Sequence, residues 1–456
     1  MKFKKIAVLF FALCFMVLPA VSGCEKEGED LCMEKYVIIE YTDTYYETVT
    51  AQAPMELPFL FGANDEKTGR LVGAGFIGPM LLNWTIEQMQ ACINAAFDMA
   101  EQYNIPVYFQ VDDCNSYTDA LGSIGNGDEV KYWENPAMCE WTSFPEEGET
   151  WGGQAEALAY QEQTGKELPY GGLPRFWFNW GNWLVAKPFP NFASPELQEL
   201  VVNNLKKGVL EPLVKRYNEL KKQGKGYLFA GIAIGWETHI PNNEQYKGQT
   251  IVNYWNNEEV MREDEQNRYG YAALTSLGYD QKRLETMAAL EGVTVDEKMD
   301  SLLWQVIHDY TELLAKTAYE AGLPKEKIYS HIVSITTSGV DPSSSWPPIW
   351  TAVNDYCTPG FTMNRQSCPY DLDELKKQIK EADSDQEKYG LVEGYDWSYA
   401  DSLEDSEEYL QSIFGSGSNI ITCFGWPTCV KNYSNKYVQA VKNWKYDTWG
   451  QVDRAL

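Results

Sequence analysis

Apolar runs of strand length alternate with amphipathic helical stretches along most of the chain. One helix is expected after the cap candidate Thr85, because residues 84–103 show helical spacing, and it leads into a buried apolar run at 105–113. The Gly-rich passage before Asn83 carries no predicted element. The other strand candidates lie at 36–41, 175–180, 227–237, 327–335, 351–364, 389–397 and 419–427. Further helices are expected after the cap candidate Ser194 and at 301–322, 371–383 and 404–417.

This order of elements predicts the fold class. Strands that alternate with helices imply parallel pairing with right-handed crossovers. Seven or eight such units favour an α/β (β/α)8 TIM barrel over an open doubly wound sheet, and no Gly-rich nucleotide-binding turn follows a strand. The chain is longer than the roughly 250 residues of a plain barrel, so we expect long loop insertions near 114–172 and 241–300. The barrel is predicted to fill residues 36–456 as one domain.

The beginning of the chain has the pattern of an export signal. Residues 1–23 combine three lysines, an apolar stretch and small residues before Cys24. The segment Val21–Cys24 resembles the bacterial lipoprotein box, which implies cleavage before Cys24, a lipid on its sulfur and a flexible tether over 24–35. The expected location is the bacterial cell envelope, with membrane contact through the anchor only. An ordinary signal peptide with an incidental cysteine is the alternative.

Charge and histidine content exclude several kinds of partner. The net charge of −29 becomes −32 after residues 1–23 are removed, so nucleic acid and anionic lipid are improbable partners. With three histidines and no CxxC motif, we expect no metal site, and we expect no cofactor. Export permits disulfides. The close cysteine spacings allow the pairs Cys114–Cys139, Cys357–Cys368 and Cys423–Cys429. The sequence does not predict an oligomeric state.

Aromatic residues are unusually frequent and cluster in loop-like stretches. The chain has 16 Trp, 29 Tyr and 18 Phe, with clusters at 175–183, 343–350 and 395–399. Aromatic rings stack on the apolar faces of sugars while nearby polar groups bind the hydroxyls. The set therefore favours glycan binding, although the rings could instead hold long loops in place.

Two predicted strands end in a glutamate. The run FAGIAIGWE ends at Glu237 and the run YGLVE ends at Glu393, and barrel enzymes carry their chemistry at the carboxyl ends of strands. This arrangement resembles the clan A retaining glycoside hydrolases, in which the glutamate of strand four is the acid/base and that of strand seven is the nucleophile. The resemblance implies these roles for Glu237 and Glu393. Trp236 departs from it, because many members have Asn there.

The resemblance also suggests residues that contact the sugar. Trp426, at the end of the last predicted strand, is similar to the tryptophan platform of the clan. Other candidates for substrate binding are Asp113, Asn179, Trp180, Trp183, Trp236, His239 and Trp397. Asp112, Asp113 and Asp396 are alternatives for the catalytic carboxylates, and a structural role is open for His239 and His331.

The distance between the carboxyl groups separates the possible functions. Hydrolysis with retention of the configuration at the anomeric carbon needs two carboxyl groups about 5 to 5.5 Å apart. Hydrolysis with inversion needs a separation of about 6.5 to 9.5 Å. The rival hypothesis is a surface-anchored glycan-binding lipoprotein without catalysis, which has no need for such a pair.

Overall fold

The computed structural model describes residues 34–41, 46–113, 132–165, 189–242, 244, 251–252, 259–261, 268–333, 342–363, 372–394, 402–423 and 426–450. The chain divides into Met1–Met33 and Glu34–Leu456, and all described residues belong to the second unit.

Nine parallel strands form one sheet. They are β1 (Lys35–Tyr41), β2 (Arg70–Met80), β3 (Val107–Asp112), β4 (Phe229–Ile234), β7 (Ile328–Tyr329), β8 (Ile332–Val333), β9 (Gly360–Thr362), β10 (Tyr389–Glu393) and β11 (Ser418–Cys423). Their order in the sheet is β7-β4-β3-β2-β1-β11-β10-β9-β8. A separate antiparallel pair joins β5 (Ile251–Val252) to β6 (Glu259–Met261).

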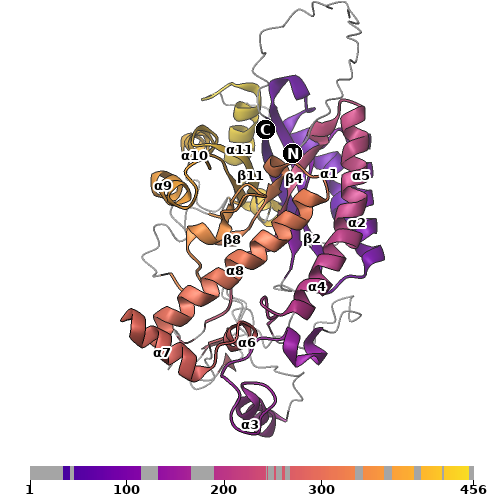
Figure 1. Ribbon diagram of the computed structural model, residues 1–456. Coiled ribbons are helices and arrows are strands. Elements are labelled where there is room, and N and C mark those ends of the chain that lie inside the picture. The colour runs from indigo at the N-terminus through magenta and orange to yellow at the C-terminus, as the bar shows by residue number, and fades with distance from the viewer. Residues whose placement is uncertain are drawn as a thin grey trace, which may run out of the picture. The chain divides into compact units, whose positions relative to one another are not determined.

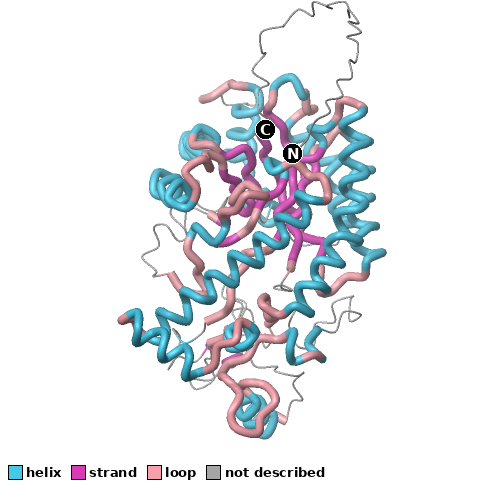
Figure 2. The backbone as a smooth tube through the Cα atoms, in the orientation of Figure 1, coloured by secondary structure: helices cyan, strands magenta, loops and turns pink. Residues whose placement is uncertain are grey.

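The two outermost strands of this order are halves of one strand. Only Ser330 and His331 separate β7 from β8 in the chain, yet β7 pairs with β4 and β8 pairs with β9. A further bridge joins Tyr329 to Thr358. The sheet therefore closes into an eight-stranded barrel, which confirms the predicted (β/α)8 fold (Figure 2). Counted around it, β4 is the fourth strand and β10 the seventh.

The described helices lie outside the barrel, and the longer ones run along its wall (Figure 1). They are α1 (Tyr46–Phe61), α2 (Ile86–Tyr103), α3 (Gln154–Thr164), α4 (Pro195–Asn204), α5 (Glu211–Lys222), α6 (Tyr271–Ser276), α7 (Gln281–Glu291), α8 (Val295–Glu320), α9 (Leu372–Ala382), α10 (Leu403–Gly415) and α11 (Trp426–Tyr446). A π-helical segment, Leu205–Leu210, joins α4 to α5. The insertion after β3 contains α3, and the insertion after β4 contains β5, β6, α6 and α7. No helix in the described ranges is long and apolar enough to span a membrane.

Helix starts follow the capping signals of the sequence. The Thr85 hydroxyl accepts a hydrogen bond from the backbone of Gln88, whose side chain accepts one from the Thr85 backbone, so α2 begins with the predicted capping region. The Ser194 hydroxyl caps α4 by accepting a hydrogen bond from the backbone of Leu197, and Pro195 is at the first position of this helix.

Strand β2 (Arg70–Met80) was not predicted, because its sequence is a Gly-rich passage. A Cβ on Gly73 would lie 2.5 Å from the Pro106 carbonyl oxygen, and one on Gly75 would lie 2.6 Å from Cγ of Glu40. The glycines are thus the result of close packing inside the barrel and do not mark a loop. The strand candidate at 175–180 lies outside the described residues, and β3 pairs directly with β4.

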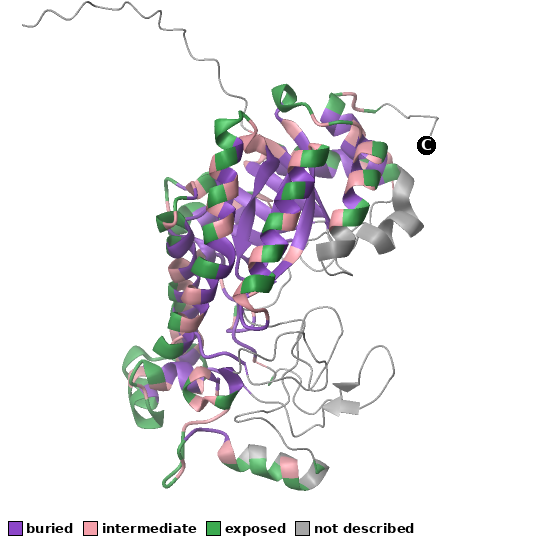
Figure 3. Ribbon diagram, turned by 90° about the vertical axis from the view of Figure 1, so that its right-hand side faces the viewer, coloured by how far each residue is buried: buried purple, intermediate pink, exposed green. Residues whose placement is uncertain are grey.

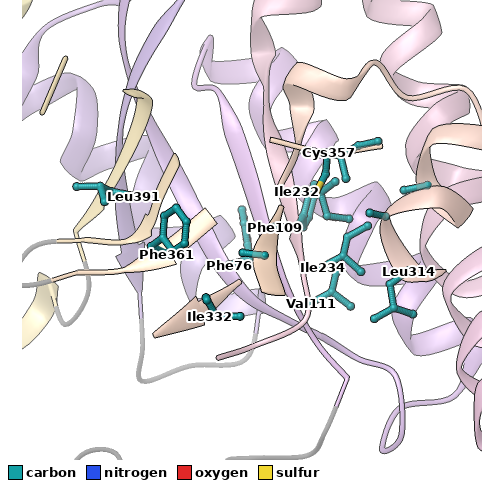
Figure 4. Close-up of a cluster of buried hydrophobic side chains, with 14 of the residues drawn as sticks. Phe76, Phe109, Val111, Ile232, Ile234, Leu314, Ile332, Cys357, Phe361 and Leu391 are labelled. Atoms are coloured by element: carbon teal, nitrogen blue, oxygen red, sulfur yellow. The ribbon is translucent and has the colours of Figure 1, made fainter. Parts of the chain in front are cut away.

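Apolar side chains pack on both sides of the barrel wall. Outward side chains from β2, β3 and β4, including Phe76, Phe109 and Ile234, belong to the same buried cluster as Leu314 of α8 (Figure 4). The strands are buried, whereas helices expose their outer faces (Figure 3). The barrel interior holds a second cluster of Tyr36, Ile38, Leu71, Tyr108, Ala230, Ala233, Tyr329, Val392 and Ile420. This layer fills the barrel beneath its carboxyl end.

The predicted partners Cys114, Cys368 and Cys429 lie outside the residues and side chains that the structure describes. Cys139, Cys357 and Cys423 are buried, and neither Cys139 nor Cys357 is in a disulfide. The Cys423 thiol lies 2.8 Å from the Tyr437 hydroxyl, and the Cys139 thiol donates to the carbonyl of Asn135 at 3.4 Å, so both have other polar partners.

The tight contact between β8 and β9 supports a stability prediction. A Cβ on Gly360 would lie 2.1 Å from the carbonyl oxygen of Ser330, so the backbone would have to move. We expect Gly360→Ala to lower the free energy of unfolding by about 1 to 3 kcal/mol in urea denaturation. In the matched control, Gly415→Ala on α10, no described atom lies within 4 Å of the added Cβ, and a gain of about 0.5 to 1 kcal/mol is expected. Equal stability of the two variants would contradict the packing.

Candidate active site

A tight turn after β4 brings Glu237 to the mouth of the barrel. Gly235 has φ 92° and Glu237 has φ 47°, a left-handed conformation that is uncommon for a residue with a side chain. The turn is held by hydrogen bonds from the Trp236 amide to Asp113 at 3.1 Å and from the Thr238 amide to the His331 carbonyl at 2.9 Å. Strain of this kind costs about 1 to 3 kcal/mol and clusters at functional sites.

Glu237 meets Glu393, the last residue of β10. Ligand atoms of Glu237, His331 and Glu393 all lie within 4.8 Å of one another, so one carboxylate oxygen of each glutamate is within that distance of the other. Both side chains are buried, with relative exposures of 1% for Glu237 and 2% for Glu393. The structure thus brings together the two residues that the sequence predicted as a pair.

Glu393 is surrounded by hydrogen-bond donors and by other carboxyl groups. Its Oε2 accepts from Nε2 of Gln110 and from Nε1 of Trp236, each at 3.0 Å. Burial raises the pKa of Glu393 well above its ordinary value, the charges of Glu237 and Glu40 add to this, and the two donors oppose it. The glutamate pair therefore resists carrying two negative charges at once and favours a state that holds one shared proton.

Glu237 has a polar partner on β9, which in turn contacts His331. Its Oε1 accepts from the Thr362 hydroxyl at 2.7 Å, and that hydroxyl lies 2.6 Å from Nε2 of His331. Nδ1 of His331 lies 3.4 Å from Nε2 of Gln110. Burial lowers the pKa of His331 to about 3, so its ring is neutral at pH 7.

Three further predicted residues lie in this region. Trp236 is buried, and its indole N–H contacts Glu393, a contact that the sequence did not predict. Asp113 accepts from the backbone of the β4 turn. His239 is buried, and its Nδ1 lies 2.6 Å from the Glu237 carbonyl oxygen.

The other predicted site residues cannot be placed. Asn179, Trp180, Trp183, Trp397 and Cys24 lie outside the described residues, as does the alternative Asp396. Trp426 begins α11, but its side chain is not among those described. The aromatic subsites therefore stay predictions.

Sequence reasoning missed Gln110, Thr362 and Glu40. Each is a polar residue in an otherwise apolar strand, and each is buried. Polar groups buried in a barrel strand need a partner, so Gln110 within VYFQVD and Glu40 within YVIIEY were detectable signals.

Glu40 lies in the barrel beside Gly75, its partner on β2. Burial raises the pKa of Glu40 to about 8, so its carboxyl group is neutral at pH 7. Because this pKa is raised by folding, the stabilising contribution is complete below the unfolded value near 4.5 and is lost as the pH rises through 8.

We expect Glu40→Gln to remove that loss. Relative to the wild type, the variant should gain up to about 4 kcal/mol of unfolding free energy between pH 5 and pH 9, measured by urea denaturation at both values. Glu140 is buried with a pKa that is also raised to about 8, and it is present in both proteins, so the comparison isolates Glu40. If the unfolding free energies of the wild type and the variant changed in parallel with pH, the raised pKa of Glu40 would be contradicted.

Among the residues that the structure describes, two groups of side chains could hold a divalent cation. One is Glu237, His331 and Glu393, and the other is His308, Asp309 and Glu312 on α8. In the first group Nε2 of His331 lies 2.6 Å from the Thr362 hydroxyl, so a cation bound to this nitrogen would replace that hydrogen bond. The second group is partly exposed.

The fold and the site together define a (β/α)8 barrel with buried carboxyl groups at the ends of its fourth and seventh strands. No protein-family model matches the sequence, and no curated protein matches it. Fifty-one chains of solved structures match. One is the catalytic domain of a beta-amylase from Paenibacillus polymyxa, at 8% identity and a TM-score of 0.46, over 89% of this chain and 98% of that domain. The fold assignment rests on the strand pairings given above.

Proposed function

We propose that the chain is a glycoside hydrolase that cleaves a neutral or weakly charged glycan with retention of configuration. The observation that carries this proposal is the pair of buried carboxyl groups, with oxygens of Glu237 and Glu393 within 4.8 Å of each other. Retaining enzymes place two carboxyl groups about 5 to 5.5 Å apart, whereas inversion leaves room for a water molecule between substrate and base.

In the first step, Glu393 attacks the anomeric carbon while Glu237 gives its proton to the glycosidic oxygen. The bond to the leaving group breaks, and a glycosyl ester forms on Glu393. In the second step, Glu237 accepts a proton from water, and the water oxygen attacks the same carbon. The ester breaks, Glu393 leaves as a carboxylate and Glu237 is again protonated.

The protein groups around the pair support this division of roles. Hydrogen bonds from Gln110 and Trp236 stabilise the anion of Glu393, so we assign the shared proton to Glu237. The neutral Glu40 adds no charge at pH 7, and the carboxyl groups supply the chemistry without a cofactor.

A screen of the wild type against aryl glycosides and plant and host glycans tests the proposed function. We expect hydrolysis of at least one substrate, with a first product that keeps the anomeric configuration when its NMR spectrum is recorded before mutarotation. A first product of inverted configuration would show that Glu393 acts as a general base toward water and not as the nucleophile. If the protein bound glycans and cleaved none of them, the result would favour the non-catalytic glycan-binding lipoprotein.

We also propose that Cys24 carries a lipid that tethers the protein to the bacterial cell envelope. The support is the Val21–Cys24 segment that resembles the lipoprotein box. Labelling with a fatty-acid analogue in the bacterial host should mark the wild type and not Cys24→Ala. Equal labelling of both would overturn the anchor.

A further inference from the structure

A line of hydrogen bonds connects the two carboxyl groups through three side chains, two of which have no part in the mechanism proposed above. From Glu393 Oε2 it runs 3.0 Å to Nε2 of Gln110 and then 3.4 Å to Nδ1 of His331. From Nε2 of His331 it continues 2.6 Å to the Thr362 hydroxyl and 2.7 Å to Oε1 of Glu237. The residues come from β3, from the junction between β7 and β8, and from β9.

The chemistry of these groups gives the line one direction. The amide nitrogen of Gln110 has two hydrogens and can only donate, so Glu393 and Nδ1 of His331 are its acceptors. The single ring proton of the neutral histidine is then on Nε2 and is donated to the Thr362 oxygen. The Thr362 hydroxyl keeps its own hydrogen for Oε1 of Glu237. Turning the Gln110 amide around would place its carbonyl oxygen against the Glu393 carboxylate.

We propose that Gln110, His331 and Thr362 form a hydrogen-bond chain of fixed direction that decides which oxygen of each catalytic carboxyl group reacts. Because Oε1 of Glu237 accepts from Thr362, the acidic proton of Glu237 is held on Oε2. Because Oε2 of Glu393 accepts from Gln110 and Trp236, the attack on the sugar comes from Oε1, which has no hydrogen-bond partner within the described part of the chain. The three are positioning residues, and their role rests on the proposed function.

Other titratable groups surround this chain. Nε2 of His331 lies 3.9 Å from Oε2 of Glu393. Glu40 on β1 and Tyr108 on β3 are electrostatically coupled to the same region, and Asp113 and His239 contact the turn that carries Glu237. The backbone of Gly235 is a further hydrogen-bond partner of His331, so the tautomer of this ring is the point at which the direction of the hydrogen bonds is tested below.

A matched set of variants tests the proposed hydrogen-bond chain through the pH dependence of kcat/KM. Removal of a donor destabilises a carboxylate and raises its pKa. Thr362→Val should move the alkaline limb, which reports protonated Glu237, upward by about one pH unit, and Thr362→Ser should restore the wild-type limb. Trp236→Phe should instead raise the acidic limb, which reports ionised Glu393. Lower activity in Thr362→Val with both limbs unmoved would reduce Thr362 to a packing role and overturn the proposal.

A second measurement needs neither a variant nor a substrate. The chain has only three histidines, so nitrogen-15 NMR can resolve their tautomers in the wild type. One histidine should be neutral with its proton on Nε2 and should not titrate between pH 5 and pH 8. Should no such histidine exist, the proposed direction is wrong whatever the enzyme does. If this histidine exists but the protein cleaves no glycan, the direction of the hydrogen-bond chain is confirmed, whereas the proposed function and the assignment of the reactive oxygens are wrong.

Discussion

Replacement of Glu393 by alanine is expected to lower kcat on an activated aryl glycoside by a factor on the order of 10⁴ to 10⁶. Without this carboxylate no glycosyl ester can form, and the remaining groups only bind and orient the substrate. Because the wild type buries the Glu393 carboxyl group away from water and beside Glu237, its removal also relieves an unfavourable burial of charge. The variant should therefore be at least as stable as the wild type in urea denaturation, which separates lost chemistry from lost folding.

Added azide sharpens the test of Glu393. A small anion can enter the space left by the carboxylate and attack the anomeric carbon from the same face, which gives a glycosyl azide of inverted configuration. The isosteric variant Glu393→Gln leaves no such space and should stay inactive with azide. Full turnover by either variant on a substrate of the wild type would show that Glu393 is not the nucleophile.

Replacement of Glu237 by alanine is expected to have an effect that depends on the leaving group. For a sugar leaving group, which needs a proton, the rate should fall by about 10² to 10⁴. For a dinitrophenyl leaving group the first step needs little protonation, so the glycosyl ester should form rapidly and accumulate. Mass spectrometry of the intact protein after rapid quenching measures this species.

Azide distinguishes the role of Glu237 from that of Glu393. In Glu237→Ala it should intercept the glycosyl ester and yield an azide of retained configuration, opposite to the product from Glu393→Ala. Matched Brønsted plots for wild type and variant supply the control, because only the variant should depend steeply on leaving-group acidity. The reverse pattern in the two variants would exchange the roles assigned to the two glutamates.

The barrel could be predicted because alternation of buried strands and amphipathic helices is written locally in the sequence. Strand β2 could not, since Gly73 and Gly75 are typical of loops unless it is known that Pro106 and Glu40 occupy the space of their side chains. The strand at 327–335 was predicted as one piece, and the structure divides it because each half pairs with a different neighbour.

The glutamate pair could be predicted because strand ends converge in a barrel, so two local observations sufficed. The hydrogen bonds between them could not. Gln110 and Thr362 are single polar residues in separate strands, and only barrel closure shows that they face His331. Trp236 departs from the pattern of the glycoside hydrolases that the sequence resembles, and only the structure shows that its indole N–H donates to Glu393.

The junction between β7 and β8 has a consequence for the order of folding. The bonds that meet around His331 and the glutamates join residues 125, 221 and 283 positions apart in the chain. Contacts of such high sequence separation form late, because the entropy lost in closing long loops opposes them. Helices and neighbouring strands can form before the barrel closes, whereas the proposed catalytic groups acquire their partners only with its closure.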